Sequence, residues 1–469
     1  MLRRAGLALF AVLLAGCTVG PNYKRPPVDV PPTFRAPQPL PPAEAASLAD
    51  LKWFDVFKDD KLQDLIRKAL VANYDLRDAV TRVDAARANL GITRSYQFPN
   101  FAASGSVDIN RLSRTGETPI PPQLLPNQDR NFGTGVLQLL SFEIDIWGRL
   151  RRATEAARAS LLSAGENRKA VVTTLVADVA TEYLTLRELD YTLEISQHTL
   201  QTRQESLGLT KQRQTGGVAT RLDIRQAEEL VYTAEETIPA IQNQIGQTEN
   251  QINLLLGRNP GEVARGRGLT EQDLPPEVPA GLPSALLERR PDIRAAEQDL
   301  IAANAEIGVA KASYFPTISL SGFLGGQSTQ LSSLFSGPSS AWSLVPQVTQ
   351  PIFTAGRLKS NVKLAEAQRE HALIAYQRTI QTAFTEVSNA LIAHQRVRES
   401  REKQVALVEA LEDRLRLAYL RYRGGVDTQL NALDADRDLF QGQLDLAEIR
   451  LQELLSFVQL YKALGGGWQ

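Results

Sequence analysis

Hydrophobic residues recur every three or four positions over two long stretches of the chain. The first stretch runs from Ile224 to Leu255 and the second from Leu430 to Tyr461. Such spacing, kept over many turns, is typical of helices packed as coiled coils. Ordinary core helices are the alternative, and they would show shorter stripes separated by caps. Pro239 should bend the first of these helices, because proline removes a backbone donor.

Each of these stretches follows a long segment without proline that ends in a Gly-Gly pair. The segment from Arg149 to Arg213 would span about 95 Å as a helix. Glycine tolerates the left-handed conformation that ends a helix and reverses the chain. We therefore expect two helical hairpins with tips at about 213–219 and 421–427. The tip residues are Gly216, Gly217 and Val218 in one hairpin and Gly424, Gly425 and Val426 in the other.

The chain contains two copies of one unit. Asn73 to Arg77 matches Arg290 to Arg294 at one offset (292 − 75 = 217), and Gly148 matches Gly356 at another (356 − 148 = 208). Constant offsets over such lengths indicate a repeated structural unit. The predicted order in each copy is helix, two strands, long helix, turn and helix. We place the two repeats at 60–265 and 283–469, with a linker at 266–282.

Two runs in each copy alternate between apolar residues and small or polar ones. They predict strands at about 97–112, 131–147, 314–328 and 339–353. A strand with one apolar and one polar face suits lipid on one side and water on the other. A soluble sandwich with one wet face alternates in the same way. Four strands are too few for a lipid-facing barrel, which needs about eight, so several chains would have to share one.

The N-terminus resembles a bacterial export signal. Residues 1–16 combine basic residues with a short apolar run, and "LAGC" ends at Cys17. This motif resembles a lipobox, which implies cleavage before Cys17 and acylation of its side chain and new terminus, for example with palmitate. Thr18 then favours the outer membrane. An ordinary leader with a chance cysteine is the alternative. The proline-rich segment that follows predicts an extended tether over 17–59.

Composition excludes several classes of function. The net charge of −1 and pI near 6.4 give no case for nucleic-acid binding. Cys17 is the only cysteine, and the three histidines His198, His371 and His394 stand alone, so no metal site is predicted. No nucleophile motif or phosphate loop is present. We expect no enzyme activity and no cofactor besides the covalent lipid on Cys17.

Several motifs, in their order and spacing, resemble one family. They are "VGPNYKRPP", "WFDVFKDDKLQDLIRKAL", "LLGRNPG", "LPSALLERRPDIRAAE" and "RYRGGVDTQLNALDADRDLF". Together they look like the TolC-like outer-membrane efflux proteins, most of all the lipoprotein channels of tripartite RND-type drug exporters. The resemblance implies a mainly α fold with a β-barrel segment. It implies a homotrimer whose strands form a twelve-stranded outer-membrane barrel, continued by a periplasmic α-helical barrel.

The same resemblance implies a function and partners. The chain would be a passive exit channel in the outer membrane, working with a periplasmic membrane-fusion adaptor and an inner-membrane RND-type pump. Within the family, a type I protein-secretion duct or a metal-efflux duct stays open. Outside it, the alternative is a lipid-anchored periplasmic coiled-coil scaffold without a pore, which would leave the alternating strands without a purpose.

Four polar residues past the second tip are spaced by four, three and four, so they share one helix face. They are Asp427, Asn431, Asp434 and Asp438. The resemblance implies an acidic constriction here, with Asp434 as its first candidate and Asp223 tied to Tyr422 or Arg423. The alternative is a solvated face balanced by Arg437. An EF-hand reading of this segment fails because the required Gly and Glu are missing.

Overall fold

The computed structural model describes residues 18–37, 47–113, 121, 123, 128–272 and 281–468. The predicted signal peptide and Cys17 lie outside the described residues. Two compact units are present, one built from parts of residues 1–26, 83–163 and 296–376 and the other from parts of 27–82, 164–295 and 377–469. Within the described part of the chain, no helix combines the length and apolarity that a membrane span requires.

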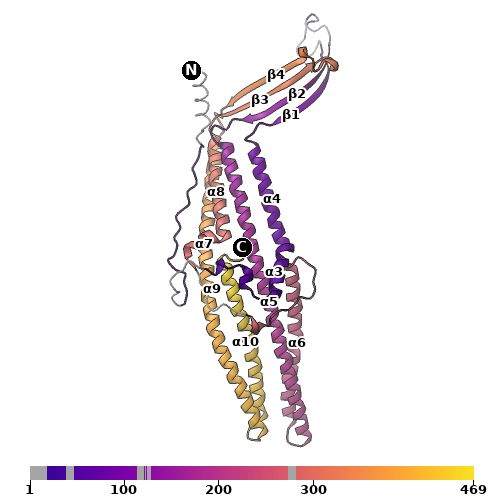
Figure 1. The fold of residues 1–469 in the computed structure, drawn as a ribbon, viewed down its shortest axis with the longest axis vertical. Helices are drawn as coiled ribbons and strands as arrows, with labels where there is room; N and C mark the ends of the chain where they lie inside the picture. The colour runs from indigo at the N-terminus through magenta and orange to yellow at the C-terminus, as the bar shows by residue number, and fades with distance from the viewer. Residues whose placement is uncertain are drawn as a thin grey trace. The chain divides into compact units, whose positions relative to one another are not determined.

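The three longest helices of one repeat match those of the other in length, and Figure 1 shows where they lie. The long helices α5 and α9 have 67 residues each, the return helices α6 and α10 have 35, and the helices α4 and α8 have 22. Pro239 lies inside α6, which continues past it. Their bounds are α4 Tyr74–Ser95, α5 Arg149–Thr215, α6 Arg221–Leu255, α8 Pro291–Ala312, α9 Arg357–Arg423 and α10 Gln429–Ala463.

Shorter helices lie near the start of each repeat, and the Asp59 carboxylate links α3 to α5 and to the segment before η2. Asp59 caps α3 through the backbone N–H groups of Lys61 and Leu62 and accepts hydrogen bonds from the Tyr183 hydroxyl (2.8 Å) and the Arg267 backbone N–H (2.8 Å). Burial alone would raise the pKa of Asp59, but these hydrogen bonds hold it below the usual value. The short elements are η1 Leu48–Asp50, α2 Trp53–Val56, α3 Asp60–Ala72, η2 Leu269–Glu271 and α7 Pro283–Arg289.

The segment after Cys17 is docked rather than free, which corrects the expected tether. The Val19 N–H donates to the Trp147 carbonyl at 3.0 Å, and Arg152 donates to the Val19 carbonyl and to Asn22. Gly20 has φ +98 and lies so close to Gly308 that a Cβ there would collide with it. Proline composition predicted an extended backbone, but it could not reveal that hydrogen-bond partners far along the chain hold this backbone in place.

The strands form one antiparallel sheet in the order β1-β2-β3-β4. β2 ends at Glu143, earlier than expected, because the Asp145 carboxylate leaves the sheet to accept the backbone N–H groups of Leu150 and Arg151 at the start of α5. Among the described residues, β1 pairs with β2 alone and β4 with β3 alone. The strands are β1 Phe101–Arg111, β2 Asp129–Glu143, β3 Thr317–Ser328 and β4 Ser340–Thr349.

Candidate functional site

The register of the sheet sorts its side chains into two faces. Partners across the strands share a face, so the pairs Ile109↔Asn131, Leu137↔Leu324 and Leu324↔Trp342 place these residues on the same side. This side, the apolar face, is open: Ile109 is 78% exposed and Trp342 75%. The apolar face also carries Phe101, Val107, Leu139, Leu320, Leu344 and Val348.

The opposite face carries mostly small and polar side chains, with Phe323 and Val345 among them. Its polar members are Ser104, Ser106, Asp108, Thr134, Gln138, Ser321, Gln327, Ser343 and Gln347. The register shifts between Leu139 and Phe142, which brings Phe142 onto the apolar face. The sequence indicated two faces on each strand, but only pairing across four strands shows that all the apolar sides coincide.

Both hairpin tips end their long helix in the same way. At the first tip, the Val218 N–H donates to the Arg213 carbonyl and the Gly217 N–H to the Gln214 carbonyl, with Gly217 at φ +77. At the second tip, the bonds run from Val426 to Arg421 and from Gly425 to Tyr422, with Gly425 at φ +72. This is the Schellman motif, in which the second glycine takes the left-handed position. Gly216 and Gly424 are the residues just before it.

The acidic residues past the second tip are each balanced by arginine within one chain. The Asp427 carboxylate accepts from Arg421 (3.0 Å) and from Asn431 (2.6 Å), and these bonds, Arg421 first, lower its pKa. Asp438 pairs with Arg414 at 2.7 Å, and that hydrogen bond lowers its pKa. Asp434 lies 3.3 Å from Arg437. The balanced face expected as the alternative is therefore present in the single chain.

The expected tie of Asp223 to Tyr422 or Arg423 is absent within the described part of one chain. Asp223 instead forms a capping box with Thr220 at the start of α6. The Tyr422 hydroxyl donates to Gln429, and its ring receives the Arg213 guanidinium at 4.5 Å. Asp223 bonds to Thr220 rather than to Tyr422 or Arg423, because a partner three residues away requires almost no additional ordering of the chain.

A buried ion pair that the sequence did not predict joins Arg203 of α5 to Asp436 of α10. Their atoms lie 2.6 Å apart, and both side chains are buried. Arg203 also donates to the Leu230 carbonyl of α6 and stacks over the Phe440 ring at 4.8 Å. Burial raises the pKa of Asp436 although Arg203 opposes this shift. An arginine within the apolar stripe of α5 was the only available signal.

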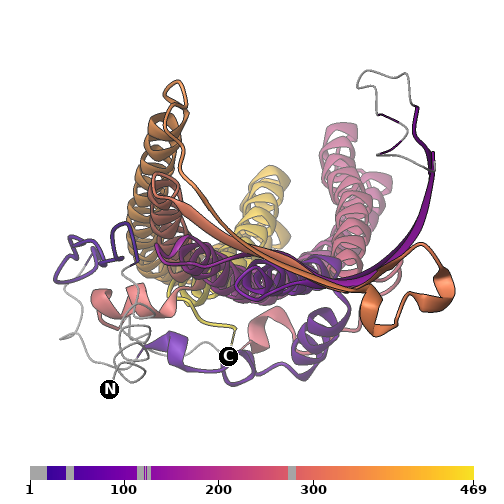
Figure 2. The ribbon, with the colours of Figure 1, turned by 90° about the horizontal axis from the view of Figure 1, so that it is seen from above.

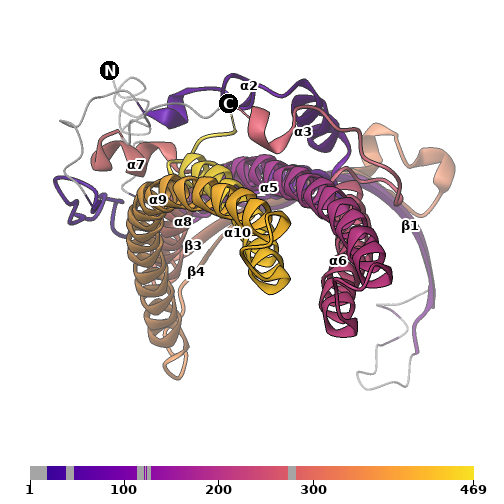
Figure 3. The same ribbon diagram turned by 90° about the horizontal axis from the view of Figure 1, so that it is seen from below.

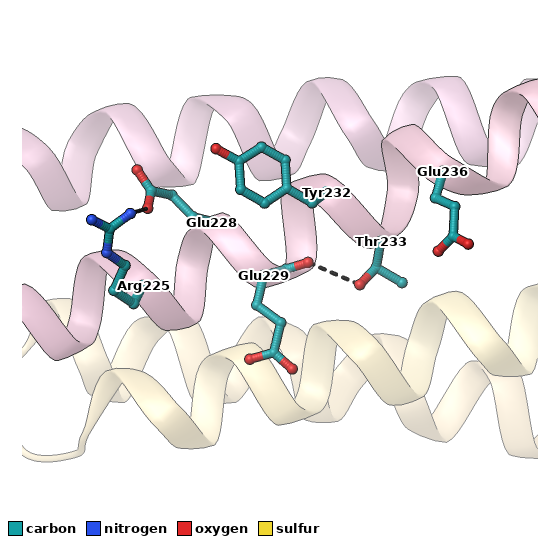
Figure 4. Close-up of a pocket in the computed structure, with 6 residues that line it drawn as sticks. All are labelled: Arg225, Glu228, Glu229, Tyr232, Thr233 and Glu236. Carbon is teal, nitrogen blue, oxygen red and sulfur yellow. Dashed lines mark hydrogen bonds and ion pairs between the residues drawn. The ribbon is translucent and has the colours of Figure 1, made fainter.

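An acidic hollow lies on α6 (Figure 4). Figure 4 shows the six side chains on one helix, with Glu229 directed toward the neighbouring helix. That carboxylate acts electrostatically on Arg437 of α10, the partner of Asp434. Carboxylates of both hairpins therefore surround this arginine. The residues that line the hollow are Arg225, Glu228, Glu229, Tyr232, Thr233 and Glu236.

An open sheet with one apolar exposed face, whose strand β2 leads into a long helical hairpin, is the architecture of channel-forming outer-membrane proteins. The model of the outer membrane efflux protein family matches residues 65–258 and 282–466. This chain therefore belongs to that family. It is an outer-membrane protein that serves as an exit channel for efflux.

Relatives and solved structures agree with this assignment. The chain is 40% identical to the probable efflux pump outer membrane protein TtgC of Pseudomonas putida, over 98% of this chain and 95% of that protein. It is 34% identical to the cation efflux system protein CusC of Escherichia coli, over 98% and 97%. The open-state MtrE outer membrane channel of Neisseria gonorrhoeae matches with a TM-score of 0.86 and 33% identity, over 97% of this chain and 99% of that one.

Proposed function

We propose that three copies of this chain close one outer-membrane barrel and form the exit duct of a tripartite efflux pump. The observation behind this proposal is the sheet with two unpaired edges. Unpaired backbone groups at an edge are costly in lipid, where no water can bond them. Pairing β4 of one copy with β1 of the next removes every edge. Three copies give about twelve strands, above the minimum of about eight.

Helices in the unit that holds the sheet support the same assembly. Contacts link α5 to Gln97 just past the end of α4, α5 to α8 through Arg152, and α8 to α9 through Lys311. The inner helices of this series are α5 and α8; α8 buries Leu300 and Ile307, whereas Ile92 of α4 and Leu364 of α9 are exposed. The two outer helices thus have the apolar surface that a neighbouring copy would cover.

We further propose that Asp434 lies nearest the narrowest part of the pore, with Asp427, Asn431 and Asp438 on the same helix face. Three symmetry-related carboxylates in a narrow passage repel one another and attract cations. The tie of Asp223 to Tyr422 or Arg423 would then form between copies, since the described part of one chain does not make it. Val218 and Val426 are exposed at the glycine turns and suit contact with a periplasmic adaptor. An inner-membrane pump bound to this adaptor would complete the tripartite assembly.

The lipid anchor on Cys17 belongs to the same proposal. Thr18, the next residue, lies against Gly148 in the short link between β2 and α5, where a Cβ on Gly148 would be 2.8 Å from the Thr18 Cγ2. Acyl chains attached one residue earlier would therefore enter the membrane beside the sheet. Each buried methylene contributes about 0.8 kcal/mol to such anchoring.

We propose small organic molecules as the cargo. Identity is higher to an antibiotic efflux protein (40%) and a toluene efflux protein (39%) of Pseudomonas putida than to the cation efflux protein CusC (34%). Among the described residues, no three His, Cys, Asp or Glu side chains gather as a metal site would require.

The native mass of the detergent-solubilised protein tests the assembly, and single-channel recording in planar bilayers tests the pore. A trimer that conducts is the expected result. A monomer would refute the shared barrel. A trimer that does not conduct would favour the scaffold, which keeps the helical hairpins but needs no lipid-facing sheet.

A further inference from the structure

The connection between β3 and β4 folds back onto the apolar face of the sheet. It contains the 3-10 turns η3 Leu331–Ser333 and η4 Gly337–Ser339. Figure 2 shows both turns on the convex side of the curved sheet, and Figure 3 shows them from below. A connection at the end of a hairpin would ordinarily point away from the strands, so its position here needs a reason.

Glycines in the sheet leave the space in which this connection packs against the apolar face. Gly105, Gly135 and Gly326 are paired side by side across three strands, and Gly133 follows on the same face. A Cβ on Gly133 would lie 2.8 Å from Cδ2 of Leu331, and one on Gly135 would lie 3.4 Å from Cδ2 of Leu334. A Cβ on Gly326 would collide with the Leu334 carbonyl oxygen. The apolar face has no side chains of its own here, and the connection supplies them.

Two large side chains of the connection remain uncovered. Phe335 is 87% exposed and Leu331 65%. Both lie on the same side of the sheet as Trp342 and Ile109, which are also exposed. Exposed apolar side chains on the outside of a sheet mark contact with an apolar medium or partner.

The connection also carries no charged side chain. No Asp, Glu, Lys, Arg or His lies between Lys311 and Arg357, whereas the β1–β2 hairpin and its connection contain charged residues such as Asp108, Arg111 and Glu117. Its backbone bonds to itself: the N–H groups of Ser333, Leu334, Ser336 and Ser339 donate to carbonyls three residues earlier. The hydroxyls of Ser333 and Ser336 do likewise. Backbone satisfied in this way can lie at the edge of a bilayer.

We propose that residues 329–339 form a membrane-seated flap on the outside of the barrel, with Leu331 and Phe335 inserted among the acyl chains of the surrounding membrane. Tryptophan side chains are favoured at the border between headgroups and hydrocarbon, and Trp342 of the apolar face would occupy that level. The flap deepens the proposed function, because it presupposes that the apolar face of the sheet meets lipid. It adds a lipid-binding role to a segment that would otherwise be an external loop.

Spin labels on single introduced cysteines test the flap in proteoliposomes. Cys17 is the only native cysteine, so the parent chain labelled in parallel gives the background. Labels are placed at Phe335→Cys, at Ile109→Cys on the apolar face and at Ser104→Cys on the opposite face. Accessibility is measured to oxygen, which concentrates in hydrocarbon, and to a nickel chelate, which stays in water. The expected oxygen-to-chelate ratio is several-fold higher at 335 and 109 than at 104.

The outcomes separate the flap from the channel. A lipid-like label at 109 with a water-like label at 335 would overturn the flap alone. A water-like label at 109 would overturn the lipid-facing sheet, and with it the proposed function. A label at 335 that neither probe reaches would mean that protein covers the patch, which also overturns the flap.

A substitution at one of the glycines beneath the connection provides a second test. Gly326→Ala should displace the connection and lower the ratio at a label on position 335 several-fold, because its methyl would occupy the place of the Leu334 carbonyl. Gly337→Ala is the matched control, since nothing lies within 4 Å of a Cβ at Gly337. An unchanged ratio in the Gly326→Ala protein would show that the glycines do not hold the connection in place.

Discussion

The turn from α5 to α6 can be compared residue by residue with the turn from α9 to α10. Both use a Schellman motif with a left-handed second glycine. The helix after the first turn is capped locally by Thr220 and Asp223, whereas Thr428 at the second makes no side-chain cap. There, arginines of the long helices hold the acids: Arg421 and Arg414 of α9 bind Asp427 and Asp438.

This difference explains why the second tip is rich in aspartate. One of its four acids, Asp436, forms a buried ion pair with Arg203 of the other hairpin, and the other three are partly exposed. The equivalent of Asp436 in the first repeat is Glu228 (436 − 208 = 228), and the equivalent of Arg203 in the second repeat is Leu411 (203 + 208 = 411). Duplication therefore preserved the turn and the helix lengths, while the contacts between hairpins became asymmetric. An identical backbone motif does not require an identical means of holding the helices together.

The largest expected effect follows from breaking the buried tie. Asp436→Ala leaves the buried Arg203 guanidinium without the carboxyl oxygen that accepts its hydrogen bond in either protonation state, which should cost about 3–5 kcal/mol of stability. Thermal unfolding of the purified protein, followed by its helical circular dichroism, measures the loss. Glu228→Ala at the equivalent position is the control and should cost much less. The double variant Arg203→Leu with Asp436→Leu should recover most of the loss. Equal losses of stability in all three variants would show that the buried ion pair does not distinguish the second tip from the first.

The two tips should also differ in their effect on the charge of the pore. Asp434→Ala removes a carboxylate that we place beside the narrowest passage, so single-channel conductance should rise and block by divalent cations should weaken. Gln226→Ala is the matched change at the equivalent position of the first repeat and should leave both unchanged. Unaltered conductance in an assembled Asp434→Ala trimer would count against this site.

The two turns themselves should respond alike. Gly217→Ala and Gly425→Ala each force a side chain into the left-handed conformation, which costs about 1–2 kcal/mol. The penalty should appear as faster proteolytic cleavage at the altered tip, because a turn opens locally before the whole protein unfolds. Gly216→Ala, at a residue without positive φ, is the control. A penalty at only one tip would show that the turns are not equivalent.

The smallest effect is a pH dependence. Burial raises the pKa of Asp436. A carboxyl group with a raised folded-state pKa adds stability below its unfolded pKa and loses that contribution as pH rises through the folded pKa. The melting temperature of the parent minus that of Asp436→Asn should therefore grow from about pH 7 to about pH 4. The pKa of Asp427 is lowered, so its carboxylate stays ionised over this range. The melting temperature of the parent minus that of Asp427→Asn should therefore stay nearly constant from about pH 7 to about pH 4. Growth in the opposite direction would mean that pairing with Arg203 outweighs burial.

Much of the architecture follows from local sequence. The repeat offsets, the turns after Thr215 and Arg423 and the two-faced strands depend on residues within a few positions of one another, so their periodicity and glycines were sufficient to predict them. The number of predicted strands also showed that one chain could not close a lipid-facing barrel by itself.

Contacts between distant segments needed the tertiary structure. The register that aligns the apolar sides of four strands, the pairing of Arg203 with Asp436 across 233 positions and the seat of Leu334 on Gly326 each join segments whose own sequences do not name the partner. For Asp223 the sequence offered both a local cap and distant partners, and the local cap won because it costs less conformational entropy. Periodicity sets what a segment forms, whereas competition among partners brought together by folding decides what it touches.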